Sequence, residues 1–371
     1  MRSAVALSLL CAACATTPRA RPTAPSPVAA AGPLGLVAVA PPELDDDLPL
    51  APLLDAVEAH AVVLERSSRV AELRFGARVV GKAEYVATLR RFVAAGRAAA
   101  SPRELWEAVR RDFQFYVARF EKPLLVTSYY EPILDGAHAP SARFSQALYR
   151  PPPDAPTPGY TRAEIDSGHK LAGRGLELCW VDPFDAFVLQ TEGSGKVRFA
   201  DGSTVALDVA GSNGHAHARL APFLAGAIPP ARMNMHTIEA YLRGLPVDEM
   251  RRILEKNPRY IFFRPRAGAG AATWLGAIAT DGRSIAADPA FVPKGALAFL
   301  VTTQPRFDAS DAAVPRTFVP LRRFVLDEDT GSGIKGARVD LFWGTGAEAR
   351  LYAGAMKQQG EIYYLAPREV R

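Results

Sequence analysis

The sequence predicts a mainly β protein with helices in its N-terminal part, an α+β fold class. Two observations predict it. Apolar residues recur at helical spacing in the first third of the chain, and short β-rich runs separated by Gly, Pro and Asp turns fill most of the remainder. The chain has 371 residues, of which 49% are hydrophobic and 22% charged. It can therefore bury a core, in one large domain or in two of ordinary size.

The first elements along the chain are predicted helices. Ser101-Pro102-Arg103-Glu104 places Ser at an N-cap, Pro in the first turn and Glu three residues later, which is a helix-start pattern. We expect this helix to bury a stripe formed by Leu105, Val109, Phe113, Tyr116 and Val117. Residues 81–99 show similar spacing, and residues 236–256 return to helix before Asn257-Pro258. We assign the early helices to support rather than to chemistry.

The predicted strands begin where the period changes, at Leu124 in LLVTSYYEPIL. From Leu176 we expect strands in LELCWV, AFVLQTEG, KVRFADG and TVALDVAG, with a hairpin closed around Asp201-Gly202. Further β-rich runs follow: RYIFFRP, SIAADP, ALAFLVT, TFVPLRRFVL, ARVDLFW and EIYYLAP. Many short strands separated by turns predict a barrel.

Composition excludes several classes of protein. The 44 basic and 39 acidic residues are too evenly mixed to indicate a nucleic-acid binder, although the net charge is +5. Only Cys179 lies in the body of the chain, which rules out a disulfide framework and a Cys-based zinc site; we expect it in the core. His215 and His217 have no third ligand at useful spacing, so no metal site is predicted. No apolar run after the start reaches the roughly 18–20 residues that span a bilayer.

The N-terminus has the features of an export signal. In residues 1–14, Arg2 precedes a short apolar run that ends in small residues. Its end, LLCAAC, is similar to a bacterial lipoprotein signal with Cys14 as the lipidated residue; the alternative is an ordinary cleaved signal. Residues 15–45 are rich in Ala and Pro and are expected to form a tether. Either interpretation implies export. With Ala15 after Cys14, a lipoprotein is expected on the periplasmic side of the outer membrane.

Three aspartates near the C-terminus are the candidate acid groups. Asp288 lies in SIAADP, Asp329 opens the turn DTGSG, and Asp340 lies in ARVDLFWGTG. Each lies at the edge of a β-rich run. The glycines after Asp329 permit positive φ angles and close backbone approach, so a sugar could lie against this turn.

The motifs around these aspartates are similar to those of a known family. SIAADP, PKGALAF and DTGSGIKGARVDLFWGTG resemble the three-aspartate double-psi β-barrel module of rare lipoprotein A, expansin-like proteins and a family of endoglucanases. Upstream, TSYYEPIL, FVLQTEGSGKVRFADG, VAGSNG and NPRYIFF resemble, in order and spacing, the motifs of the membrane-bound lytic murein transglycosylase A family. The resemblance covers roughly residues 100–367.

This resemblance implies a double-psi β-barrel domain, an inserted second β-domain and a substrate groove between them. The expected boundaries are 46–133 for the helical part of the barrel domain, 134–268 for the inserted β-domain and 269–371 for the double-psi barrel with the three aspartates. The implied substrate is the glycan strand of peptidoglycan. The implied partners are that strand, the membrane through the lipid anchor and other cell-wall enzymes, with no nucleic acid and no metal or organic cofactor.

The implied reaction needs one carboxyl group. The resemblance implies Asp340 as the catalytic residue, with Asp329 and Asp288 as supporting carboxylates. A lytic transglycosylase cuts the β-1,4 bond between N-acetylmuramic acid and N-acetylglucosamine, and the C6 hydroxyl of the muramic acid replaces water. Because this attack is intramolecular, one residue can act first as acid and then as base, leaving a 1,6-anhydro end.

The protonation state of Asp340 stays open at this point. Burial against Phe342 or Trp343 would raise its pKa, whereas a nearby Lys335 or Arg338 would lower it.

The residues expected to bind sugar carry hydrogen-bonding or aromatic groups: Tyr129, Tyr130, Gln190, Ser194, Gly195 and Asn213. Successive strand residues point to opposite faces, so we expect at most one of the two tyrosines to meet sugar. Glu192 stands where the family usually has Gln, and together with Glu131 it leaves a hydrolytic acid–base pair open.

Two other functions therefore remain as alternatives. An expansin-like lipoprotein would bind peptidoglycan or another polysaccharide without cutting it. A hydrolase of another β-1,4-glucan would need a second carboxylate and would release reducing ends. The upstream motifs favour the transglycosylase, because the barrel-only families lack them.

Overall fold

The computed structural model describes residues 34–369 except 155, 157, 269 and 309–313. The signal at 1–14, Cys14 and most of the expected tether lie outside the described residues. No helix in the described part has both the length and the apolar character needed to span a membrane.

The larger body is a closed six-stranded β-barrel, in which β5 pairs with β15 on one side and with β16 on the other. Its strands are β5 Leu124–Glu131, β12 Ser284–Ala287, β13 Leu297–Arg306, β14 Thr317–Asp329, β15 Arg338–Thr345 and β16 Lys357–Pro367. Two strands extend the sheet beyond β16: β4 Phe113–Arg119 and β1 Gly35–Val39. The pairs β12–β14 and β5–β15 are parallel, so strands distant in sequence share edges.

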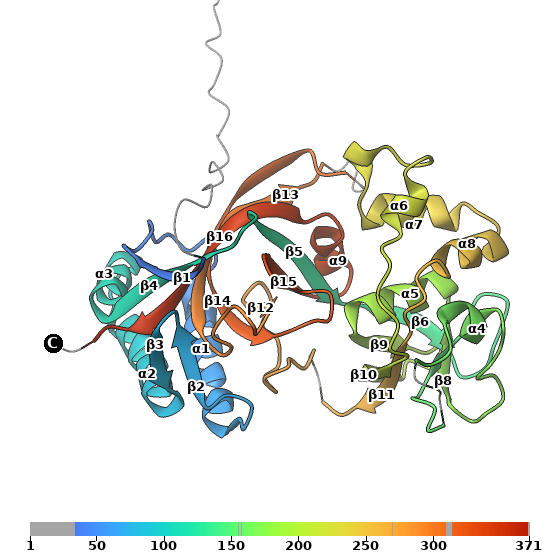
Figure 1. The fold of residues 1–371 in the computed structure, drawn as a ribbon, viewed down its shortest axis with the longest axis horizontal. Coiled ribbons are helices and arrows are strands. Elements are labelled where there is room, and N and C mark those ends of the chain that lie inside the picture. The colour runs from blue at the N-terminus through green and yellow to red at the C-terminus, as the bar shows by residue number, and fades with distance from the viewer. Residues whose placement is uncertain (1–33, 155, 157, 269, 309–313, 370–371) are drawn as a thin grey trace, which may run out of the picture.

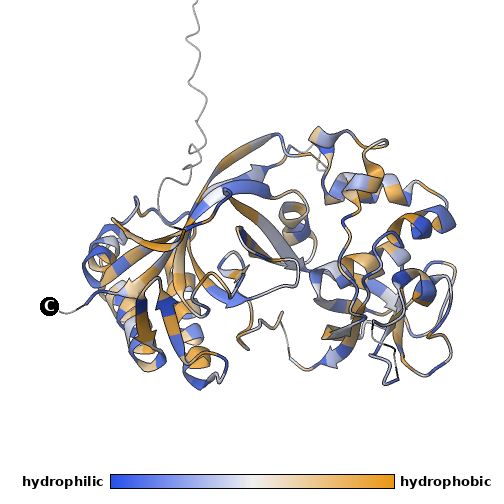
Figure 2. Ribbon diagram, viewed as in Figure 1, coloured by the Kyte–Doolittle hydropathy of each residue, from blue (hydrophilic) through white to orange (hydrophobic). Residues whose placement is uncertain are grey.

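Helices cover this barrel at one end (Figure 1). They are α1 Leu50–Arg66, α2 Lys82–Ala98 and α3 Pro102–Asp112, with a small hairpin of β2 Glu72–Phe75 and β3 Arg78–Gly81 between the first two. Figure 2 shows that the helices carry both hydrophobic and hydrophilic residues. Their apolar sides join the barrel core, where Phe324 of β14 packs against Phe92 of α2 at 5.6 Å and Phe299 of β13 at 4.9 Å between ring centroids.

The second body is an inserted sheet with the order β11-β10-β9-β6-β8-β7. Its strands are β6 Ile133–Ala137, β7 Gln146–Tyr149, β8 Glu177–Val181, β9 Ser194–Arg198, β10 Thr204–Ser212 and β11 Ile261–Arg266. Its helices are α4 Arg162–Asp166, α5 Pro183–Glu192, α6 Ala221–Leu224, the 3₁₀ turn Pro230–Arg232, α7 Met235–Arg243 and α8 Val247–Leu254. In Figure 1 this body lies beside the barrel, with α9 Ala347–Ala353 of the barrel facing α7.

The predicted fold class is confirmed, and several predicted elements are confirmed with it. Ser101 caps α3 by accepting a hydrogen bond from the N–H of Glu104 at 3.4 Å. The hairpin around Asp201-Gly202 joins β9 to β10, and Gly202 has the positive φ of +83° that its turn requires. Cys179 is fully buried in the inserted body.

Three predictions about secondary structure are wrong in part. The helix begun at Ser101 ends at Asp112, and Phe113 starts β4, because β4 is needed to pair with β1 and β16. The single helix expected at 236–256 is two helices, α7 and α8, broken by Gly244-Leu245-Pro246. Within the expected tether, residues 35–39 instead form β1 on the open edge of β4.

The run AFVLQTEG, predicted as a strand, lies almost entirely in α5. Asp182 accepts hydrogen bonds from the N–H groups of Phe184 and Asp185 at 2.9 and 3.2 Å, and Pro183 occupies the first turn. Gly193 ends the helix at a φ of +87°. The prediction failed because α5 is buried almost all round, and a continuous apolar run does not separate a buried helix from a buried strand.

Candidate active site

Asp340 lies in β15, where the barrel meets the inserted body. Its backbone is in register with Thr127 of β5 and with Ala286 of β12. The residue is 8% exposed, and its Oδ1 accepts a hydrogen bond from the Thr127 hydroxyl. Oδ2 has no hydrogen-bond partner among the described residues, so one carboxyl oxygen is held and the other is available to a ligand.

Burial raises the pKa of Asp340 above its usual value. Two neighbours oppose this effect: the guanidinium of Arg338, whose NH2 lies 3.6 Å from Oδ1, and the hydroxyl of Thr127. Arg338 also donates from Nε to Thr127 at 2.9 Å, so the three side chains form one chain of hydrogen bonds. Both influences expected from the sequence are present, and burial prevails.

Asp329 lies at the end of β14, two strands from Asp340. Ala286 of β12 pairs with Asp329 on one side and with Asp340 on the other, which places their backbones about 10 Å apart. The Asp329 carboxylate accepts the N–H groups of Trp274 at 2.8 Å and Thr330 at 2.9 Å. Burial nevertheless raises the pKa of Asp329. The barrel thus brings two of the three predicted aspartates to neighbouring positions on either side of β12.

Tyr129 contacts Asp329 and lies near Asp340. It lies two residues after Thr127, on the same face of β5, and its phenol donates to Oδ2 of Asp329 at 3.0 Å. Burial, together with the charges of Asp329 and Asp340, raises the pKa of Tyr129, so the phenol stays protonated. Tyr130 points to the opposite face and is buried among the helices of the inserted body.

Asp288 has a different environment. Its carboxylate accepts the N–H groups of Ala290 at 3.2 Å and Gly336 at 2.9 Å, and Lys335 lies 3.8 Å away. Although burial acts to raise it, these groups together lower the pKa of Asp288. The ionised carboxylate of Asp288 therefore holds the turn that follows Asp329 in place.

Three of the expected sugar-binding residues, Gln190, Ser194 and Gly195, lie in α5 and β9 of the inserted body. Gln190 is 7% exposed, and both polar atoms of its amide are buried without a hydrogen-bond partner among the described residues. Ser194 and Gly195 start β9. A Cβ on Gly195 would come within 2.5 Å of Leu189 and 2.9 Å of the Pro132 carbonyl, so this glycine serves close packing.

The side chain of Asn213 has a structural role. It is 4% exposed, and its Nδ2 donates to the carbonyls of Tyr160 at 2.9 Å and Pro258 at 2.8 Å. Its Oδ1 accepts the N–H groups of Tyr260 at 2.9 Å and His215 at 3.3 Å. The amide has no group left for a sugar, and the expectation that Asn213 binds one is not supported by its place.

Glu131, considered as a second carboxylate, lies where the chain crosses from the barrel into the inserted body. It is fully buried and pairs with Arg266 at 2.6 Å and Lys196 at 3.1 Å, and it also accepts the hydroxyl of Thr345 at 3.1 Å. Glu131 lies where the chain enters the inserted body and Arg266 lies where it leaves, so their ion pair connects the two crossings. Two cations hold Glu131 in a structural role.

Sequence reasoning did not find two contributors to the site. Thr127 holds Asp340 only because β5 and β15 run parallel in register, and a threonine in a strand carries no signal of that pairing. The cluster of Glu131, Lys196 and Arg266 likewise depends on three elements meeting at the crossing. In the described part of the chain, no group of three or more His, Cys, Asp or Glu side chains could hold a metal ion.

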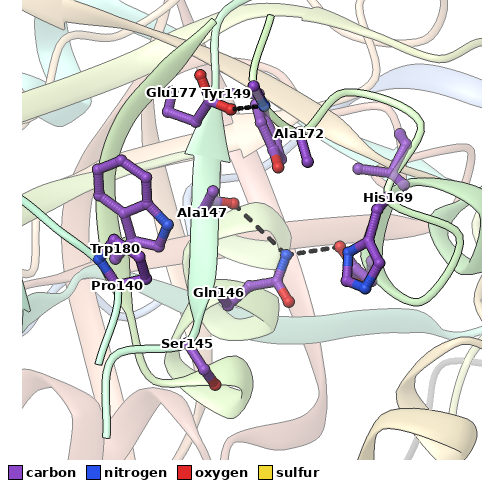
Figure 3. Close-up of a pocket in the computed structure, with 12 residues that line it drawn as sticks. Pro140, Ser145, Gln146, Ala147, Tyr149, His169, Ala172, Glu177 and Trp180 are labelled. Atoms are coloured by element: carbon purple, nitrogen blue, oxygen red, sulfur yellow. Dashed lines mark hydrogen bonds between the residues drawn. The ribbon is translucent and has the colours of Figure 1, made fainter. Parts of the chain in front are cut away.

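A cavity of about 270 Å³ lies in the inserted body (Figure 3). Its polar lining is internally satisfied: Gln146 donates to Asp166 at 2.6 Å and accepts from Arg251 at 3.0 Å. Burial raises the pKa of Asp166 to about 6. None of the sequence-predicted site residues lines this cavity, so it is separate from the candidate active site.

Fold and site define a double-psi β-barrel protein with an inserted β-domain and a carboxyl site at the junction of the two. Residues 125–264 match the MltA specific insert domain, and residues 283–366 match the 3D domain. The chain belongs to the membrane-bound lytic murein transglycosylase A family.

Individual relatives agree with this assignment. The membrane-bound lytic murein transglycosylase A of Vibrio cholerae is 29% identical over 249 residues. The match covers 65% of this chain and 65% of the length of that relative. The solved membrane-bound lytic murein transglycosylase of Agrobacterium tumefaciens superposes with a TM-score of 0.72 at 28% identity, covering 90% of this chain and 98% of that one. The lytic transglycosylase LtgG of Burkholderia pseudomallei gives 0.60 at 30% identity, covering 91% and 97%.

Proposed function

We propose that this protein is a lytic transglycosylase that cleaves the β-1,4 bond between N-acetylmuramic acid and N-acetylglucosamine in peptidoglycan and leaves 1,6-anhydro ends. The observation that carries the proposal is the environment of Asp340. Its carboxyl group is buried with a raised pKa, one oxygen is held by Thr127, and the other has no hydrogen-bond partner in the part of the chain that the structure describes. Family membership and the names of the relatives support the same activity.

The reaction follows from this geometry. Protonated Asp340 gives its proton to the glycosidic oxygen as the bond to C1 breaks, and the N-acetylglucosamine part leaves as an alcohol. The C6 hydroxyl of the same muramic acid attacks C1, and the Asp340 carboxylate takes up its proton. Proton and residue are both restored, and no water is consumed. A fixed intramolecular nucleophile replaces the second carboxylate of a hydrolase.

The remaining site residues have supporting parts in this proposal. Asp329, held by Trp274, Thr330 and Tyr129, faces the same region as Asp340 and contributes a hydrogen-bond acceptor for the glycan. Asp288 fixes the turn after Asp329. Gln190 is the contact with sugar proposed for the inserted body, and its buried amide has no hydrogen-bond partner among the described residues. In this proposal residues 134–268 form one wall of the groove and the barrel forms the other.

The proposal includes the place of the protein in the cell. We place it on the periplasmic side of the outer membrane, held by a lipid on Cys14, in contact with peptidoglycan and other cell-wall enzymes. The names of the relatives, which describe membrane-bound proteins, support membrane association. A Cys14→Ala variant is then expected in the soluble fraction of the cell.

Product mass tests the activity directly. Wild-type protein and Asp340→Asn are incubated with purified peptidoglycan, and the soluble fragments are weighed by mass spectrometry. We expect fragments one water lighter than hydrolytic products from the wild type, and none from the variant. Hydrolytic masses would indicate a glycan hydrolase, and retention on peptidoglycan without fragments would indicate an expansin-like binding protein.

A further inference from the structure

Glu192 is a carboxyl group beside Asp340 that the reaction above does not use. It is the last residue of α5, and its Oε2 accepts the backbone N–H of Tyr130 in β5 at 3.2 Å. Gly193, with a φ of +87°, then turns the chain into β9. The Asp340 carboxylate of β15 is near enough for its charge to act on Glu192. Glu192 is half-buried, so part of its surface is open to solvent.

The surroundings of Glu192 contain no compensating positive charge. No Lys, Arg or His in the described part of the chain forms an ion pair with it. The cation that acts on Tyr130 from α9, Arg350, is paired with Glu239 of α7. The carboxyl-terminal end of α5 also disfavours a negative charge. Burial, with a contribution from the charge of Asp340, raises the pKa of Glu192 to about 8. At neutral pH the group is a carboxylic acid.

The hydrogen bond to Tyr130 then decides which oxygen carries the proton. Oε2 accepts the N–H of Tyr130, so it is the carbonyl-type oxygen, and the hydroxyl is on Oε1. No N–H or O–H group of the described residues donates a hydrogen bond to Oε1. Oε1 is therefore the oxygen that remains for a ligand bound beside Asp340.

We propose that Glu192, as a neutral carboxylic acid, donates a hydrogen bond from Oε1 to a hydroxyl or amide oxygen of the N-acetylated sugar bound beside Asp340. This inference rests on the proposed transglycosylase function and adds a second residue that must be protonated. Asp340 transfers a proton during the reaction, whereas Glu192 keeps its proton and orients the sugar.

The alkaline side of the pH profile tests this inference. If both acids must be protonated, kcat/KM on soluble glycan strands falls on the alkaline side to a limiting logarithmic slope of −2, and the bend due to Glu192 lies near pH 8. Glu192→Gln keeps a donor but cannot ionise, so the slope becomes −1. Glu192→Ala loses the donor, and its kcat/KM at pH 6 falls about two- to tenfold, more than that of Glu192→Gln. Glu121→Gln, an exposed carboxyl in the turn before β5, is the matched control and keeps the wild-type slope.

Each outcome separates this inference from the proposed function. Anhydro products with a slope of −1 in both wild type and Glu192→Gln would refute the role of Glu192 and leave the transglycosylase intact. Hydrolytic products lost in Glu192→Gln would overturn both, because an ionised Glu192 would then act as the base for water. Thermal unfolding at each pH shows that the proteins remain folded throughout the profile.

Discussion

The hydroxyl of Thr127 acts to lower the pKa of Asp340 against the effect of burial, and Thr127→Val tests this relation. Valine has nearly the same shape as threonine but cannot donate to Oδ1 of Asp340 or accept from Nε of Arg338. In the wild type this hydrogen bond favours the ionised form of Asp340. Its loss in the variant therefore raises the pKa of that carboxyl further. A hydrogen bond to a charged group contributes about 1.5–3 kcal/mol, which corresponds to a rise of about 1–2 pH units.

The sign of the effect on activity follows from the role of Asp340 as an acid. Since the protonated form is active, a higher pKa extends activity to higher pH. The first bend on the alkaline side of the kcat profile therefore moves upward by about 1–2 units. At low pH the variant is slower than wild type, because the carboxyl is a weaker acid and is less well fixed in position.

The assay is the pH dependence of anhydro-product release from soluble glycan strands. Thr204→Val is the matched control, because Thr204 is exposed at the start of β10 and distant from β15 in the fold. An alkaline bend that stays at the wild-type pH, or moves downward, in a folded Thr127→Val protein would refute the reasoning.

Two further predictions concern stability. Glu131→Ala leaves Arg266 and Lys196 without their carboxylate at the crossing between the two bodies, and we expect a loss of about 3–5 kcal/mol in urea unfolding. A loss below 1 kcal/mol would contradict the structural role of Glu131. His60 donates from both ring nitrogens, to Glu328 at 2.7 Å and to the carbonyl of Gly295 at 2.8 Å, when it is protonated. Although burial alone would lower it, Glu328 raises the pKa of His60 above the usual 6.5, so its stabilisation is full below pH 6.5 and is lost as the pH rises through the raised value. His60→Gln should flatten that decline in unfolding free energy, and an unchanged decline would assign it to other groups.

The sequence was sufficient for the elements whose signals are local. The cap at Ser101, the turn at Gly202 and the run of short C-terminal strands each depend on neighbouring residues, and all three are present in the structure. Residue order was also enough to recognise the family, because its motifs recur with their spacing intact. The three aspartates were found in this way, and Asp340 lies at the junction where the resemblance placed the groove.

Burial and strand pairing were decided only by the tertiary structure. AFVLQTEG forms a helix because a buried apolar run has no period of its own, and Phe113 leaves a helix because β16 offers a partner strand. Asn213 was expected to meet sugar, but its amide is bonded to backbone groups of two other segments, at Tyr160 and at Pro258 and Tyr260.

The acid–base character of the site also depended on three-dimensional contacts. Thr127 and Glu192 are 213 and 148 positions from Asp340 in the chain, yet the parallel pairing of β5 with β15 and the end of α5 bring both to it. A pKa is set by the charges, hydrogen bonds and solvent within a few ångströms, and these neighbours come from three separate elements. The sequence determined which acids are present, and the fold determined which of them keep a proton.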